Sequence, residues 1–213
     1  EGPRRFTAKV RILHVDTATE WRGGQNQIVL TALGQIAQGH DVRIFANARG
    51  ELAARAAKLA LPLEPAEVGR GDLSWSTIKA IGRAVDAFSP AVIHVHESHG
   101  LPGAILAARH AEPRPRLVAS RRVDFPLRFL SRMKYQQVDR VLAVSEAVRN
   151  VLIRGGLAPH SVTLVHEGVP DRPPASGGHE ALIALGVPPG VPVVGNVAQL
   201  VDHKDHATLL RAA

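Results

Sequence analysis

The sequence predicts an α/β fold in which helices cover both faces of a parallel β-sheet. Short apolar segments rich in Val, Ile and Leu alternate with segments of helical periodicity, which is the pattern of repeated strand and helix units. Most of the apolar segments lack strict alternation of polar and apolar residues, so we expect strands that are buried on both faces.

Six strands are expected in the first 170 residues, at 10–16, 41–46, 91–96, 116–122, 140–144 and 161–166. Between the first two, apolar residues from Ile28 to Ile36 recur at helical spacing, and Gly39 stands where a helix C-terminal glycine belongs. Two further helices are expected to end at Ser89-Pro90 and at Gly155-Gly156, because proline and glycine stop helices.

The length of 213 residues suits one domain and part of a second. Residues 1–170 form the expected first domain. Residues 171–190 are rich in proline and glycine and are expected to be a linker with about one helical turn at 182–185. A strand at 191–197 and a helix near 206–213 are expected to begin a second α/β domain whose remainder is absent from the sequence.

Composition excludes several function classes. The chain has no cysteine, so it has no disulfide, no thiol nucleophile and no thiolate zinc site. It has no apolar run of ~18 residues and no signal-peptide pattern, so we expect a soluble, cytoplasmic protein. Ser145 follows a strand without the flanking glycines of a nucleophile elbow, which favours a helix N-cap over a hydrolase serine.

The net charge of +7 is concentrated in one segment. Residues 114–134 contain seven basic residues and one acidic residue, a net charge of +6. The segment contains few aromatic residues and no RNA- or DNA-binding motif, so we expect no nucleic-acid partner. Residues 126–134 read as a short helix with apolar and basic side chains, which could lie on an anionic membrane or pack Leu127, Leu130 and Met133 on the sheet.

Polar residues follow five of the predicted strands, beginning at Thr17, His94, Ser120, Ser145 and His166. The carboxyl ends of parallel strands share one edge of a sheet, where ligands of such folds bind. The sequence therefore predicts a functional cleft at this edge.

Two glycines precede the first long helix. The backbone N–H groups of Gly23 and Gly24 could meet a phosphate at the positive end of that helix, and a plain tight turn is the alternative.

The histidines of the third predicted strand invite a metal interpretation, because His94 and His96 share one face. No cysteine completes a site and a hydrogen-bonded core histidine explains His94, so we expect no metal. His96 or His99 is expected to contact a sugar or phosphate. Glu97 could be an acid, a base or a ligand of an acceptor hydroxyl, or a surface charge of the loop.

Two adjacent arginines end the fourth predicted strand. Alternation sends one of Arg121 and Arg122 inward and the other outward. The inward guanidinium is a candidate anion ligand because it offers a bidentate fork, and a surface pair with Asp124 is the alternative.

Six motifs occur in the order and spacing of one enzyme family. They are Gly23-Gly24, Gly39-His40-Asp41-Val42, Ile93-His94-Val95-His96, the segments VLAVSE at 141–146 and VHEGV at 165–169, and GNVAQLVDHK at 195–204. Together they resemble retaining glycosyltransferases of family 4, which have the GT-B fold of two Rossmann-like domains. The resemblance covers nearly the whole chain.

The resemblance implies transfer of a sugar from a nucleotide-sugar donor to an acceptor with retention of configuration, without a cofactor or an essential metal. The amino-terminal domain of such enzymes mostly holds the acceptor, and the carboxyl-terminal domain holds the nucleotide. By position, Gly23 and Gly24 would approach the donor phosphates, Lys204 would neutralise the departing pyrophosphate, and Glu167 and Gly168 would border the donor cleft.

Three features depart from the family pattern. Gln199 stands where the family often has an arginine, and Arg121-Arg122 stands where many members have a histidine. The paired glutamates that hold the donor sugar and ribose lie outside the sequence. Our candidate site residues are His96 and Arg122 for catalysis and Glu97, Ser98 and Arg121 for acceptor binding.

We therefore expect a hexosyl-transferring enzyme of polysaccharide or lipopolysaccharide biosynthesis, acting on a glycan or glycolipid acceptor. The chain alone is expected to be inactive, and residues 121–134 are expected to contact the inner face of an anionic membrane. The alternatives are a nucleotide-sugar epimerase of the same architecture and a non-catalytic module that binds lipid-linked glycans.

Overall fold

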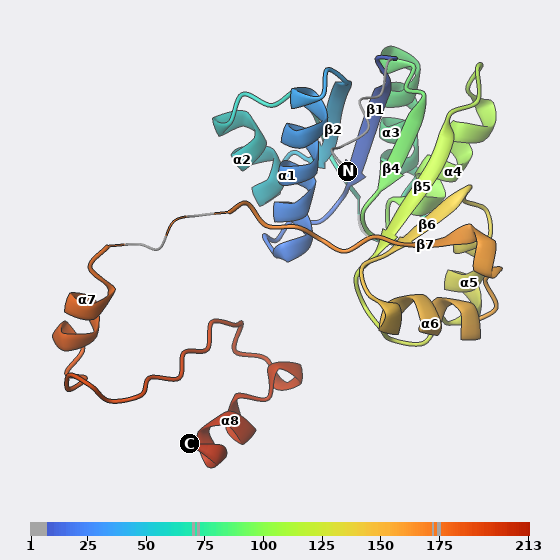
Figure 1. Ribbon diagram of the computed structural model, residues 1–213. Helices are drawn as coiled ribbons and strands as arrows, with labels where there is room; N and C mark the ends of the chain where they lie inside the picture. The colour runs from blue at the N-terminus through green and yellow to red at the C-terminus, as the bar shows by residue number, and fades with distance from the viewer. Residues whose placement is uncertain (1–7, 70, 72, 172, 174–175) are drawn as a thin grey trace. The chain divides into compact units, whose positions relative to one another are not determined.

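The computed structural model describes residues 8–69, 71, 73–171, 173 and 176–213, and its centre is a seven-stranded sheet (Figure 1). The order of strands is β3-β2-β1-β4-β5-β6-β7, and every pair is parallel. The strands are β1 (Arg11–Asp16), β2 (Asp41–Asn47), β3 (Leu63–Ala66), β4 (Val92–Val95), β5 (Arg116–Arg121), β6 (Arg140–Ala143) and β7 (Val162–Leu164). The predicted α/β, Rossmann-like fold is confirmed.

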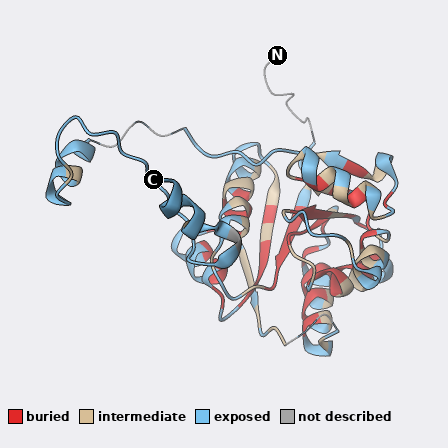
Figure 2. Ribbon diagram, turned by 90° about the horizontal axis from the view of Figure 1, so that it is seen from below, coloured by how far each residue is buried: buried red, intermediate tan, exposed pale blue. Residues whose placement is uncertain are grey.

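Helices cover both faces of this sheet. The helices α1 (Gly23–Ala37) and α2 (Glu51–Lys58) pack on one face. The opposite face is covered by α3 (Trp75–Phe88), α4 (Leu101–His110), α5 (Phe129–Tyr135) and α6 (Glu146–Arg154). Figure 2 shows the consequence: the strands are mostly buried, whereas the outer faces of the helices are exposed.

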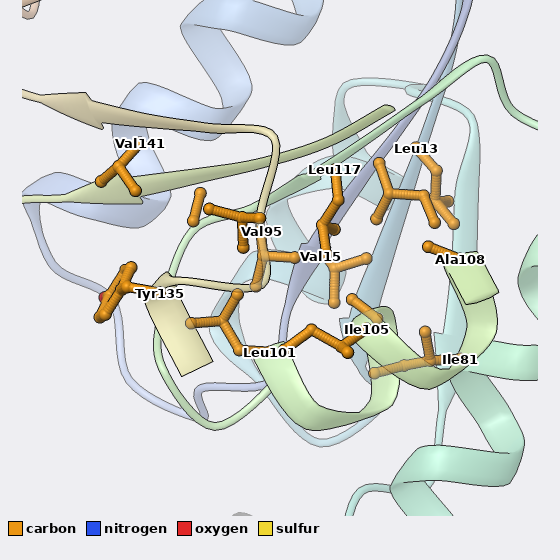
Figure 3. Close-up of a cluster of buried hydrophobic side chains, with 14 of the residues drawn as sticks. Leu13, Val15, Ile81, Val95, Leu101, Ile105, Ala108, Leu117, Tyr135 and Val141 are labelled. Carbon is orange, nitrogen blue, oxygen red and sulfur yellow. The ribbon is translucent and has the colours of Figure 1, made fainter. Parts of the chain in front are cut away.

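The larger core lies between the sheet and the α3–α6 layer. Leu13 and Val15 of β1 point into it and meet Ile81 of α3 and Leu101 of α4, and all four are fully buried or nearly so (Figure 3). Since side chains alternate along a strand, the neighbouring residue His14 points to the α1 face instead. The same alternation decides which polar residues share a face at the carboxyl edge.

Local signals explain where the elements begin and end. The Ser145 hydroxyl accepts a hydrogen bond from the Val148 amide, so it is the N-cap of α6 as predicted. Gly39 follows the end of α1 with φ = 88°, a left-handed conformation that glycine adopts without strain. The helix α3 ends at Phe88, directly before Ser89-Pro90.

Several elements escaped prediction or differ from it. The strand β3 has the sequence LEPA and pairs only with β2, and an edge position tolerates its proline. The helices α2 and α4 were also not predicted. The short helix expected at 126–134 begins later, at Phe129, with Arg128 as its N-cap residue.

The chain divides into two compact units, Glu1–Val169 and Pro170–Ala213. The second unit contains α7 (Gly178–Ala184), a 3-10 turn at Asp202–Lys204 and α8 (His206–Ala212). The predicted strand at 191–197 is wrong, because the structure describes these residues and they form no strand. A strand needs a hydrogen-bonded neighbour, and the described part of this unit contains no other strand to pair with it. Within the described residues, none of the helices combines the length and apolar character needed to cross a membrane.

Candidate functional site

The candidate site lies at the carboxyl edge of the sheet, where the strand order reverses between β1 and β4. The chain leaves β1 toward α1 and leaves β4 toward α4, which covers the opposite face. Diverging connections of this kind open a crevice in doubly wound sheets, and that crevice binds ligands.

Arg122 is the centre of one half of this edge. Its Nη1 donates to the His96 carbonyl oxygen at 3.2 Å, and its Nη2 lies 3.3 Å from His96 Nδ1. Its Nε forms an ion pair with Glu167, and the two side chains are 19% and 32% exposed. The carboxylate partner of Arg122 is therefore Glu167, and the alternative of a surface pair with Asp124 is wrong for this arginine.

The start of α1 approaches the same guanidinium. A Cβ added at Gly24 would lie 3.5 Å from Arg122 Cδ, whereas one at Gly23 would meet nothing within 4 Å. The Arg122 side chain thus lies within van der Waals distance of the position a Gly24 Cβ would take, beside the helix N-terminus. The positive end of α1 thus lies near a guanidinium that is itself paired with Glu167.

A small cavity of about 150 Å³ lies beside this cluster. Gln27 on α1 lines one side and donates from Nε2 to the Gly168 carbonyl oxygen at 2.7 Å. His96, Arg122 and Glu167 line it from the strand ends. The structure therefore brings together the predicted residues His96, Arg122, Glu167 and Gly168, with Gly24 next to them.

A second, larger cleft of about 670 Å³ opens at the ends of β1, β2 and β4. Its lining is polar and includes Thr17, Gln25, Asn47, Arg49 and Glu97. The volume is within the usual range of ligand pockets, about 300–1,000 Å³.

Glu97 lines this cleft, but it also holds the loop before α4. Its Oε1 accepts hydrogen bonds from the Thr17 hydroxyl and the Gly100 amide, each at 2.8 Å, and its Oε2 accepts from the His99 amide. These bonds satisfy backbone donors near the start of α4. The carboxylate is thus fixed in orientation at the wall of the cleft.

The other predicted residues lie apart from the Arg122 cluster. Ser98 accepts at its carbonyl oxygen from Lys134 Nζ at 3.2 Å. Arg121 is buried on the opposite face, where Nη2 donates to the Phe125 carbonyl oxygen at 2.6 Å and the guanidinium lies 5.6 Å from the Tyr135 ring centre. Alternation thus separates Arg121 from Arg122 as expected, and Lys204 belongs to the second unit.

Asp16 is a functional candidate that the sequence reasoning missed. It ends β1 and is 1% exposed, and both of its carboxylate oxygens accept from Gln25 Nε2, at 3.3 and 3.1 Å. Burial, followed by the charge of Glu97, raises the pKa of Asp16 to about 6. The sequence signal was available, since Asp16 is an acidic residue at the end of a buried strand.

His14 was also missed. Its ring centre lies 5.3 Å from that of His94 and 5.1 Å from that of His96, and the ligand nitrogens of the three residues all lie within 4.8 Å of one another. Burial lowers the pKa of His14 to about 4 and that of His94 and His96 well below the ordinary value, with the neighbouring positive charges adding to the shift. All three imidazoles are therefore neutral at pH 7. Three histidines are enough ligands to hold a metal ion. Hydrogen bonds, however, already occupy several of their ring nitrogens.

Known structures share this fold. A glycosyltransferase from Rickettsia africae matches with a TM-score of 0.79 and 17% identity, over 96% of this chain and 56% of that one. Anabaena Alr3699/HepE in complex with UDP and glucose matches with a TM-score of 0.76 and 17% identity, over 95% and 57%. The lipopolysaccharide outer core galactosyltransferase WaaB matches with a TM-score of 0.60 and 12% identity, over 75% and 46%. This chain thus spans little more than half the length of the first two.

No curated protein sequence matches the chain. The model of glycosyltransferase family 4 matches residues 21–172, which include the start of α1, His96, Arg122 and Glu167. That match covers most of the chain, and the chain therefore belongs to glycosyltransferase family 4.

Proposed function

We propose that this chain supplies the acceptor-side half of a retaining glycosyltransferase that moves a hexosyl group from a nucleotide-sugar to a glycan or glycolipid. The observation that carries the proposal is the convergence of Arg122, His96 and Glu167 with the Gly24 end of α1 at the crevice of the sheet. Anabaena HepE, of similar fold, was solved with UDP and glucose, which supports a nucleotide-sugar donor.

The chemistry follows from where charge develops. When the bond between the sugar and the nucleotide breaks, negative charge grows on the departing phosphate. A guanidinium already fixed by His96 and Glu167 stabilises that charge without reorganising, as does the positive end of α1. This electrostatic role needs no metal ion, and we propose that the enzyme uses none.

The polar cleft of about 670 Å³ is the proposed acceptor site. Carboxylate and amide side chains such as Glu97, Asn47 and Gln25 are suited to hydroxyl groups, and two lining arginines are paired with carboxylates, Arg22 with Glu20 and Arg49 with Glu67. We therefore propose that the cleft holds the acceptor sugar through its hydroxyl groups. Asp16 accepts a hydrogen bond from Gln25, which lines the cleft.

The nucleotide half of the enzyme is proposed to come from a second Rossmann-like domain. Lys204 and the other residues matching the donor-domain motif belong to the second unit, and the paired glutamates of the family lie outside the 213 residues. We therefore propose that the 213 residues alone do not transfer sugar, so activity is to be measured on the protein as its gene encodes it.

We also propose a contact between α5 and an anionic membrane in a cytoplasmic setting. Leu127 is half-buried against the core, whereas Phe129 and Leu130 are 65% and 73% exposed. An apolar groove of about 360 Å³ between α4 and α5 adds Met133 to this surface, and Arg128 supplies exposed positive charge. Exposed apolar side chains next to basic ones are typical of interfacial helices.

The membrane contact is tested by flotation with vesicles of phosphatidylglycerol and of phosphatidylcholine. We expect binding to the anionic vesicles alone, with a loss of at least tenfold in Arg128→Glu and no loss in Arg83→Glu, an exposed arginine on α3. Binding that is unchanged by Arg128→Glu would contradict the electrostatic contact.

The activity is tested with a panel of nucleotide-sugars and lipid-linked or free glycans, with products identified by mass spectrometry and the anomeric configuration by NMR. We expect a product whose new glycosidic bond has the donor's configuration. An inverted product would refute the retaining reaction. Epimer formation without an acceptor would indicate the epimerase, and binding of glycans without turnover would indicate the non-catalytic module.

A further inference from the structure

A chain of hydrogen bonds runs from α1 through the buried histidines to Arg122. Gln35 Oε1 lies 2.8 Å from His14 Nε2, and His14 Nδ1 lies 2.8 Å from His96 Nε2. His96 Nδ1 in turn lies 3.3 Å from Arg122 Nη2. Four side chains from α1, β1 and the segments that follow β4 and β5 are thus linked in series.

The arginine fixes the direction of every bond in this series. A guanidinium only donates, so His96 Nδ1 accepts and His96 carries its proton on Nε2. That Nε2–H donates to His14 Nδ1, so His14 carries its proton on Nε2 and donates to the Gln35 amide oxygen. Both histidines are neutral in this scheme, in agreement with the burial that lowers their pKa.

The third histidine stands beside the series. His94 Nε2 lies 2.8 Å from Ser120 Oγ, and its ring centre is 4.0 Å from that of His96 with an interplanar angle of 35°. His94 therefore packs on the His96 ring and restrains its plane. A metal ion bound to this cluster would have to break the bond between His14 and His96 and would lie next to the cationic Arg122.

We infer that His14 and Gln35 are positioning residues that hold His96 in its Nε2–H tautomer, so that its Nδ1 lone pair orients the Arg122 guanidinium at the crevice. The inference rests on the proposed function only for the role of Arg122, and the series itself stands independently. Without the Gln35 oxygen, His14 could place its proton on Nδ1. His96 would then turn an N–H toward Arg122, and the guanidinium would lose the bond to the ring while keeping those to the His96 carbonyl oxygen and Glu167.

The tautomers are tested by NMR of the protein labelled with ¹⁵N at histidine, at pH 7. The three rings identify themselves through mutual proton contacts, because their centres are 4.0–5.3 Å apart. We expect His14 and His96 to be neutral with the proton on Nε2, and equimolar Zn²⁺ to leave their signals unchanged. A proton on Nδ1 of His96, a charged His96, or tight zinc binding by the cluster would overturn the inference.

A pair of variants, one within α1 and one at its C-cap, tests the consequence for Arg122. Gln35→Leu removes the terminal acceptor, and Gln38→Leu is the matched control at an exposed position. We expect Gln35→Leu to fold, to show mixed tautomers at His14 and His96, and to lower kcat about tenfold, as losing one hydrogen bond to a charged group would. The acceptor KM should be unchanged, and the control should match the wild type.

The outcomes separate this inference from the proposed function. If the protein transfers no sugar, the proposed function is refuted. The tautomers of His14 and His96 then still show whether His14 and Gln35 hold His96 in its Nε2–H form. If Gln35→Leu keeps the wild-type tautomers, or shifts them with kcat unchanged, the positioning role is refuted while the glycosyltransferase remains.

Discussion

The carboxylate of Asp16 gives the most quantitative prediction. It is 1% exposed, and its burial beside Glu97 raises its pKa from 3.8 to about 6. A group whose pKa is higher in the folded protein binds more protons there, so folding stability falls as pH rises from about 4 to 6. At 1.36 kcal/mol per pKa unit, the ionised carboxylate costs about 3 kcal/mol of stability at pH 7.

The buried histidines act in the opposite direction over nearly the same range. Burial lowers the pKa of His14 from 6.5 to about 4. The stability that goes with neutral, buried His14 is therefore lost as pH falls from about 6.5 to about 4. The pH dependence of the wild type alone therefore mixes two opposing effects. A variant that removes only the carboxylate separates them.

The variant is Asp16→Asn, measured by urea unfolding at intervals from pH 4 to pH 8. At pH 4 we expect Asp16→Asn to be no more stable than the wild type. Between pH 4 and pH 7 its free energy of unfolding should rise by about 3 kcal/mol relative to that of the wild type. Asp86→Asn, at an exposed position on α3, is the control and should show no such change. A stability difference between Asp16→Asn and wild type that does not vary with pH would refute the reasoning.

Two further pairs of substitutions probe the cluster and the core. A Cβ at Gly24 would already be in van der Waals contact with Arg122 Cδ at 3.5 Å, so the two further methyl groups of Gly24→Val should displace the arginine side chain and lower donor turnover. Gly23→Val has open space and should be mild; equal rates in the two variants would contradict the contact. Leu101→Ala, at a fully buried position, should cost about 2–5 kcal/mol in urea unfolding, and Leu130→Ala, at a 73% exposed position, less than ~1 kcal/mol. Similar losses in both leucine variants would contradict the assigned core.

The fold was largely predictable because its signals are local. Buried strands and amphipathic helices leave their pattern in neighbouring residues, and alternation alone separated Arg121 from Arg122. The strand β3 escaped because an edge strand needs little apolar sequence. The expected strand at 191–197 failed for the opposite reason: its sequence has the pattern, but the described residues of its unit form no strand that could pair with it.

The site was predictable only in part. The edge of the sheet and its glycines, histidines and arginines follow from the positions of the strand ends. The series through His14 and Gln35 does not, because it requires knowing that β1 pairs with β4 and places His14 opposite His94, 80 residues along the chain. Glu167 could likewise not be paired with Arg122 from sequence, since 45 residues separate them.

The role proposed for Arg122 is stabilisation of the departing phosphate of a nucleotide-sugar. It is tested most directly by kcat/KM for the donor in Arg122→Gln of the protein as its gene encodes it, with the exposed Arg83→Gln as the control. The loss of one preorganised donor to a developing charge predicts a fall of about 10²–10³-fold in Arg122→Gln and none in Arg83→Gln. A kcat/KM within about twofold of the wild type for Arg122→Gln would contradict the claim.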